Sequence, residues 1–204
     1  MGIRGLWFAR PSASGESVMR AWNGWYHVTG CTYGCWLPGD PRGWRTRRHR
    51  EHVEGDYRHP PAEAQYEVIY EQSKALLKHA PVQLSQAQRR AAGEALVEML
   101  SRLGVEVIAI SVDAVHYHIL GRFLDGQVRR RVGLAKKHAS HVLREHGLVG
   151  AVWAKRSRPL PITNRAHQLN ACRYIADHAE YGAWMWTFRE GLYWVGNDGN
   201  TRTK

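Results

Sequence analysis

The chain has 204 residues, a length suited to one domain with its own apolar core and short for two. It carries 29 Lys and Arg residues against 18 Asp and Glu residues. The resulting formal charge of +11 favours a polyanionic partner, since phosphates are the usual target of a basic surface. No apolar run approaches the roughly 20 residues needed to span a bilayer, which argues against a membrane-spanning protein.

The first 20 residues predict a loosely held tail, because they contain Ser, Gly and Pro and show no periodic apolar pattern. They also lack the long apolar core of a secretory signal. The three cysteines are an odd number and cannot form a closed disulfide framework. We therefore expect a cytoplasmic protein with reduced thiols, one domain over residues 21–190 and a second tail over residues 191–204.

Residues 26–33 are aromatic and β-branched and predict a first strand that ends at Gly34. A basic insertion follows over about residues 36–80, where arginines are mixed with Trp and His. Arginine for phosphates and aromatic rings for stacking on bases is the chemistry of single-strand binding, although a solvated basic loop has the same composition. The candidate DNA-binding residues of this insertion are Arg42, Arg45, Arg47, Arg48 and Arg50.

A zinc site is an alternative use of the same region. Cys31 and Cys35 form a Cys-x3-Cys pair that nearby histidines could complete. The pair lacks the matching second half of a recognisable zinc signature, so the pattern favours other interpretations.

Two helices are predicted next. Residues 62–79 can be helical, and residues 86–103 carry a stronger apolar stripe. Ser85 is the expected N-cap of the second helix, and Gly104 is its expected C-cap.

Residues 105–123 predict two strands joined by a tight turn, and the second strand contains His116, Tyr117 and His118. Side chains alternate along a strand, so the two histidines share one face while Tyr117 points to the other. Two imidazoles on one face can hold a divalent ion. The plainer interpretation is that one is solvated and the other is hydrogen-bonded in the core.

The remaining elements are a helix over residues 128–145, a strand over residues 150–158 closed by the prolines that follow, and a last helix over residues 165–181 with Thr163-Asn164 as its candidate cap. The first of these helices has a cluster of cations that fits a phosphate-facing surface, although a solvated face explains any one of them. These candidate DNA-binding residues are Arg129, Arg130, Arg131, Lys136 and Lys137.

The predicted order is strand, insertion, helix, strand, strand, helix, strand, helix. Helices on one side of a small antiparallel sheet make an α+β sandwich of ferredoxin-like kind, which is the fold class we expect.

On the last helix, Tyr174 and His178 are four residues apart and therefore share a face. A phenol is a poor nucleophile at neutral pH because its pKa is near 10, but a divalent cation can polarise a phosphate and position it for attack. If this helix lies against the strand of His116 and His118, His178 can supply a third ligand and Tyr174 can reach a bound phosphate. Taken alone, Tyr174 would be a half-buried core aromatic.

These residues resemble the single-tyrosine transposases of the HUH superfamily, which include insertion-sequence and REP-associated tyrosine transposases. The resemblance is carried by His116-Tyr117-His118 and by Tyr174-Ile175-Ala176-Asp177-His178, and the segment from Thr32 to Gly43 is similar to the opening of some members. It spans residues 25 to about 185.

The resemblance implies an HUH-nuclease sandwich and a transposase that acts on single-stranded or hairpin DNA in a prokaryotic, nucleoid-associated setting. It implies that His116, His118 and His178 hold Mg²⁺ or Mn²⁺. Tyr174 would attack the scissile phosphate, leaving a 5′-phosphotyrosine link and a free 3′-hydroxyl. The chain departs from its relatives in two places, since they often have Gln or Asn in place of His178 and usually an apolar residue in place of Tyr117.

Two other functions stay open at this point. One is a catalytically inactive nucleic-acid binder of the same descent, which would bind DNA in a salt-dependent way without cleaving it. The other is a replication-initiator or relaxase nickase, although the chain is short for an added helicase module. The resemblance allows a homodimer and does not fix whether Tyr174 acts in its own subunit or in a partner.

Overall fold

A computed structural model describes residues 21–40, 66–188 and 193–194 of the chain. The predicted tail over residues 1–20, the five candidate arginines between Arg42 and Arg50, and all but two residues of the predicted tail over 191–204 lie outside this part. Within the described ranges, no helix is both long enough and apolar enough to cross a membrane.

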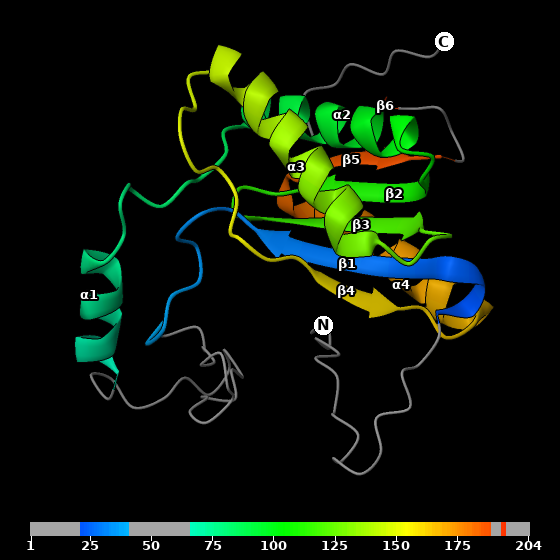
Figure 1. The fold of residues 1–204 in the computed structure, drawn as a ribbon, viewed down its shortest axis with the longest axis horizontal. Coiled ribbons are helices and arrows are strands. Elements are labelled where there is room, and N and C mark those ends of the chain that lie inside the picture. The colour runs from blue at the N-terminus through cyan, green and yellow to red at the C-terminus, as the bar shows by residue number, and fades with distance from the viewer. Residues whose placement is uncertain (1–20, 41–65, 189–192, 195–204) are drawn as a thin grey trace.

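The fold is built on a six-stranded antiparallel sheet in the order β4-β1-β3-β2-β5-β6 (Figure 1). The first four strands, together with α2 and α3, follow the ferredoxin-like order. The predicted α+β class is confirmed. The elements are β1 (Trp25–Cys31), α1 (Glu67–Ala75), α2 (Gln86–Arg102), β2 (Glu106–Val112), β3 (His116–Arg122), α3 (Val128–Glu145), β4 (Arg158–Pro161), α4 (Arg165–Asp177), the 3-10 turn η2 (His178–Tyr181), β5 (Trp184–Thr187) and β6 (Tyr193–Trp194).

The helices α2 and α3 cover one face of the sheet and form the larger core with it (Figure 1). Alternation along β3 sends Tyr117 and Ile119 into this core. The Tyr117 side chain is fully buried, and its hydroxyl lies 2.6 Å from the Ser157 hydroxyl. Gly30 lies opposite Tyr117 on β1, where an added Cβ would come within 2.3 Å of the phenol oxygen. The ring of Tyr117 therefore requires a glycine on the neighbouring strand.

The helix α4 packs against the opposite face of the sheet, around a smaller apolar cluster. The expectation that all helices lie on one side was therefore wrong for α4, although α2 and α3 do share a face. The physical reason is that β2 and β3 carry apolar residues at both alternating sets of positions, so both faces need a cover. The members of the smaller cluster are Ala109, Leu120, Ile162, Ala171, Ile175 and Met185.

Local signals placed the starts of α2, α3 and α4 and the central turn correctly, whereas the helix predicted over residues 62–79 is the shorter α1, which begins at Glu67. The Ser85 hydroxyl accepts a hydrogen bond from the backbone N–H of Gln88, and the Gln88 side chain accepts one from the Ser85 N–H, which makes a capping box. Asn164 caps α4 by accepting from the backbone N–H of His167 at 2.8 Å. The turn between β2 and β3 closes with the Asp113 N–H donating to the His116 carbonyl at 2.8 Å.

The predicted strand over residues 150–158 was wrong in position. The strand there is β4, which begins at Arg158, and Trp153 forms only an isolated bridge with Thr32. The prolines expected to close a strand lie inside β4, and they are tolerated because β4 is at the edge of the sheet. The short strand β5 was not predicted at all.

Candidate active site

Three histidines from two distant segments meet beside the α4 face of the sheet. His116 and His118 come from β3, and His178 is the residue that follows α4. One nitrogen from each ring lies within 4.8 Å of the other two. The rings of His118 and His178 are stacked with centroids 4.5 Å apart, and those of His116 and His178 are 5.0 Å apart. This histidine cluster could hold a metal ion.

Burial keeps the cluster uncharged. It lowers the pKa of His116, His118 and His178, and the effect is largest for His118, where the charges of His27 and of the other two rings add to it. For His116 the carboxylate of Asp113 opposes the shift, with Oδ2 lying 3.6 Å from Nδ1. A neutral imidazole keeps one nitrogen lone pair available for a cation.

Two nitrogen atoms of the cluster have unmet hydrogen-bonding capacity. The Nε2 atoms of His118 and His178 are buried and have no hydrogen-bond partner among the described residues. A buried polar atom in this state is costly, and a shared cation would satisfy both atoms at once. The chemistry of the donors and their convergence therefore fit a divalent metal.

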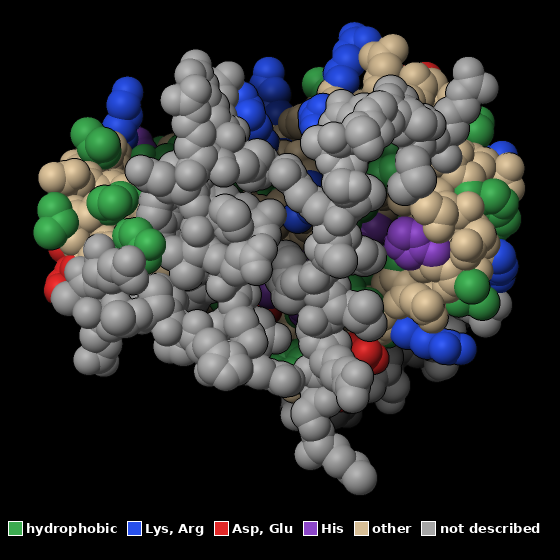
Figure 2. All heavy atoms as spheres, turned by 90° about the horizontal axis from the view of Figure 1, so that it is seen from below, with side chains coloured by type: hydrophobic (Ala, Val, Ile, Leu, Met, Phe, Trp, Pro, Cys, Tyr) green, Lys and Arg blue, Asp and Glu red, His purple; other side chains and the backbone are tan. Residues whose placement is uncertain are grey.

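Tyr174 lies at the cluster and remains accessible. Its ring centroid is 5.3 Å from that of His118 and 5.1 Å from that of His178, while 44% of the residue is exposed. Figure 2, which views the molecule from below Figure 1, shows histidine side chains at the surface of the described part. The phenol thus belongs to neither apolar core and lies beside the histidines.

The packing of α4 explains how Tyr174 reaches this position. Ala171 and Ile175 are one turn apart and fix the helix on the sheet. Tyr174 lies one residue before Ile175, and His178 lies three residues after it. They therefore flank the buried stripe on the side of the histidine pair.

A fourth histidine, His27 on β1, belongs to the site and was assigned no role by sequence analysis. Its Nε2 lies 3.0 Å from Nδ1 of His118, and both residues are buried. Burial lowers the pKa of His27 to about 4, and the charges of His167 and His178 add to the shift. The sequence placed His27 in a strand, but nothing local shows which strand would lie beside it.

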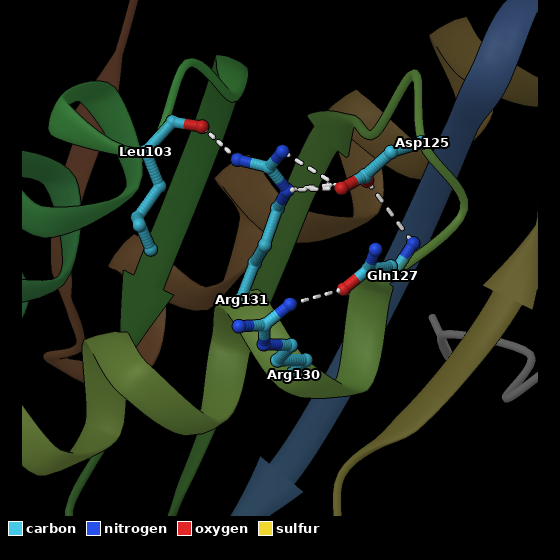
Figure 3. A network of polar contacts seen from close by, with 5 residues as sticks. All are labelled: Leu103, Asp125, Gln127, Arg130 and Arg131. Atoms are coloured by element: carbon cyan, nitrogen blue, oxygen red, sulfur yellow. Dashed lines mark hydrogen bonds and ion pairs between the residues drawn. The ribbon is translucent and has the colours of Figure 1, made fainter.

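The basic residues predicted on α3 lie across the sheet from the histidine cluster, and three of the five have structural partners. Arg131 binds the carboxylate of Asp125 and the carbonyl of Leu103, and the nearby Arg130 bonds to Gln127 (Figure 3). Lys136 is buried and donates to the Ala154 carbonyl at 2.7 Å. The other two predicted cations, Arg129 and Lys137, are exposed.

A basic cavity of about 410 Å³ lies between α3 and the segment before β4, and we call it the α3 groove. It brings Lys155 and Arg156, which the sequence analysis missed, together with two predicted cations. The described residues that line it include no carboxylate. The lining residues are Arg129, Gly133, Lys136, Lys155, Arg156 and Ser157.

The α3 groove and the histidine cluster lie at the same end of the sheet. Cys31 at the end of β1 pairs with His116, and its carbonyl accepts a hydrogen bond from the Ala154 N–H at 2.9 Å. The carbonyl of the same Ala154 accepts the bond from Lys136. One short hydrogen-bonded path therefore joins the two regions around the end of β1.

The alternative zinc site gains no support in the described residues, where Cys31 and Cys35 belong to no group of three potential ligands. The histidines of the basic insertion lie outside this part of the chain.

No family model and no curated protein matches the chain. The chain is similar to a solved REP-associated tyrosine transposase. That transposase is bound to a REP hairpin; the similarity covers 84% of this chain and 75% of that one, with 16% identity and a TM-score of 0.47.

Proposed function

We propose that this protein is a metal-dependent nuclease and strand transferase that acts on single-stranded or hairpin DNA in the manner of the HUH single-tyrosine transposases. The observation that carries the proposal is the contact of an accessible Tyr174 ring with the rings of His118 and His178. The formal charge of +11 supports a DNA partner.

His116, His118 and His178 would hold the cation, for which we propose Mg²⁺ or Mn²⁺. When bound, the cation would polarise a phosphodiester and offset its charge. Of the two ions, Mn²⁺ accepts imidazole ligands more readily, whereas Mg²⁺ prefers oxygen. Mn²⁺ is therefore the better probe.

In the proposed reaction, the phenol of Tyr174 loses its proton to water while its oxygen forms a bond to phosphorus. The bond from phosphorus to the 3′ oxygen breaks, and that oxygen takes up a proton. The products are a 5′-phosphotyrosine link and a free 3′-hydroxyl. In strand transfer the same steps run in reverse, with the 3′-hydroxyl of a second DNA strand as the attacking group. The accessible position of Tyr174 allows both the leaving strand and the second strand to reach the phosphotyrosine.

The test is to incubate the protein with end-labelled hairpin DNA carrying single-stranded flanks and Mn²⁺, and to resolve denatured samples on a gel. A labelled protein–DNA adduct is expected for the unaltered chain and for Tyr181→Phe, a control in the exposed tyrosine of η2. No adduct is expected for Tyr174→Phe. An adduct that persists in Tyr174→Phe rules out this nucleophile, and DNA binding without any adduct in either metal indicates an inactive binder.

We propose that Tyr174 acts on the metal site of its own chain, since the tyrosine and the histidines lie together in a single chain. Mixing Tyr174→Phe with a His118→Ala variant tests this. Neither variant alone should form the adduct, and the mixture should not form it either. An adduct in the mixture would show that the tyrosine of one subunit serves the histidines of another.

We further propose that the α3 groove binds the phosphate backbone of the DNA. The double variant Lys155→Gln/Arg156→Gln should weaken DNA binding and lower the slope of log affinity against log salt by about 1.4, since each single-strand phosphate contact contributes about 0.7. The control Arg90→Gln/Arg102→Gln removes the same charge from α2, where both arginines pair with glutamates. Equal slopes of log affinity against log salt for the two double variants would exclude the α3 groove as a phosphate-binding surface.

A further inference from the structure

We infer that His27 is a positioning residue for the proposed metal site: it accepts the Nδ1 proton of His118 and so directs the Nε2 lone pair of His118 into the cluster. The inference rests on the proposed metal-binding function, and it adds a residue that the HUH resemblance does not supply. Its basis is the 3.0 Å contact between His27 Nε2 and His118 Nδ1, made between two neighbouring strands.

The two rings can share this contact in only two ways if both are neutral. In the first, His118 carries its proton on Nδ1 and donates it to His27, which leaves Nε2 of His118 with a lone pair. In the second, His27 donates, and His118 must carry its proton on Nε2. The second arrangement would aim an N–H at the centre of the cluster and prevent binding of a cation there.

The surroundings of His118 favour the first arrangement. Its Nε2 has no hydrogen-bond partner among the described residues, so an N–H at that atom would be buried without an acceptor. His118 is 6% exposed and His27 is 8% exposed, and water therefore has little access to either residue. Donation from His118 to His27 leaves the bare lone pair where His116 and His178 converge.

A charged group lies near the same nitrogen of the neighbouring residue, His116. The carboxylate of Asp113, a residue of the tight turn before β3, lies 3.6 Å from Nδ1 of His116, which is longer than a hydrogen bond. Metal-bound histidines nearly always donate their second ring N–H to a carboxylate, carbonyl or water, and this bond fixes the ring and its protonation. In this site, a second imidazole lies within hydrogen-bond distance of Nδ1 of His118, and a carboxylate lies near Nδ1 of His116.

The inference is tested by replacing His27 with a residue that keeps the acceptor and with residues that remove it. In His27→Gln, the side-chain oxygen can lie near the former Nε2 position and accept the same proton. In His27→Leu and His27→Phe no acceptor remains. His138→Leu, in which a histidine of α3 bonded to Glu98 is removed, is the matched control.

The first readout is the protonation of His118 in metal-free protein, followed by nitrogen-15 NMR of the imidazole rings. We expect the proton on Nδ1 in the unaltered protein, His27→Gln and His138→Leu, and its transfer to Nε2 in His27→Leu and His27→Phe. The second readout is Mn²⁺ affinity by calorimetry, which should fall about 10- to 100-fold in the two apolar variants and stay close to the unaltered value in the other two.

The outcomes separate this inference from the proposed function. If the His118 proton stays on Nδ1 and Mn²⁺ affinity is unchanged in His27→Leu and His27→Phe, His27 has no positioning role while the metal site stands. If the unaltered protein fails to bind Mn²⁺ but the proton still moves when His27 is removed, the metal site fails while the role of His27 in orienting His118 stands. If one apolar variant does not fold, the other provides the comparison with His27→Gln.

Discussion

The two faces of the sheet differ in what they bury: one carries the larger apolar core, and the other carries a smaller core and the histidine cluster. Among the described residues, the face under α2 and α3 holds a core of 22 buried residues, whereas the face under α4 holds a core of six. Because buried apolar area supplies most of the stabilising free energy, the first face carries most of the stability. On the second face, the histidine cluster and Tyr174 occupy part of the area that apolar residues could otherwise cover.

A single strand serves both faces. In β3, Tyr117 and Ile119 enter the large core, while His118 turns toward α4. The contrast between Tyr117 and Tyr174 summarises the division: the first is buried and hydrogen-bonded to Ser157, and the second is accessible beside the histidines. Stability and chemistry should therefore respond to different substitutions.

The largest expected effect on stability is in the large core. Leu96→Ala on α2 removes a fully buried side chain and should lower the free energy of unfolding by about 2–5 kcal/mol, measured by urea denaturation. The control Leu169→Ala on α4, at a partly exposed position, should cost far less. Mn²⁺ affinity of the folded Leu96→Ala protein should be unchanged, and a parallel loss would mean that the two faces are not independent.

The pH dependence of stability should come mainly from the other face. The pKa of His27 is about 4 in the folded chain and about 6.5 when unfolded, so the unfolded state binds more protons between these values. The contribution of His27 to the free energy of unfolding is therefore fully present above pH 6.5 and is lost as the pH falls toward 4. This loss is on the order of 3 kcal/mol. Urea denaturation with a chelator at pH 7 and pH 5 checks this. His27→Gln should show a shallower loss, and an equal loss in both proteins would contradict the assignment.

Two glycines in helix interiors offer a sharper comparison of packing. An added Cβ at Gly93 of α2 would lie 1.9 Å from the Trp184 ring, so Gly93→Ala should destabilise the protein by roughly 1–3 kcal/mol. A Cβ added at Gly133 of α3 would meet no neighbouring atom of the described residues within 4 Å, so Gly133→Ala should stabilise the protein by about 0.5–1 kcal/mol, since alanine is the better helix former. Thermal or urea denaturation measures both; changes of the same sign would refute the packing of Trp184 on Gly93.

The smallest expected stability effects separate the two tyrosines. Tyr117→Phe removes the bond to Ser157 and should cost about 1 kcal/mol, with adduct formation on DNA retained. Tyr174→Phe alters a side chain at the surface and should change stability by less than about 0.5 kcal/mol, with adduct formation lost. The pair is measured by denaturation and by the adduct assay. Loss of the adduct in Tyr117→Phe would indicate that the nucleophile is Tyr117, on the other face of the sheet.

Features that depend on neighbours in the chain were predicted correctly. The strand pair around the Asp113 turn, the shared face of His116 and His118, and the caps Ser85 and Asn164 follow from alternation and from local hydrogen bonds. The spacing of Tyr174 and His178 likewise follows from helix geometry.

Features that depend on pairing between distant segments were missed or misplaced. The position of β4 was wrong because proline is excluded only from inner strands, and the sequence does not show which strand is at the edge. Lys155 and Arg156 of the α3 groove were missed for the same reason, since the segment that contains them was predicted to be a strand. His27 was missed because its role depends on its contact with the His118 ring, which lies on the adjacent strand.

By itself, the sequence determined the α+β class, the two halves of the histidine cluster and the tyrosine beside them, because periodicity and spacing fix which side chains share a face. Only the tertiary structure decided that α4 covers the second face, that three imidazoles converge there and that His27 bonds to His118. Those contacts join residues far apart in the chain, and they depend on strand order and register, which follow from the packing of the whole domain and not from any local pattern.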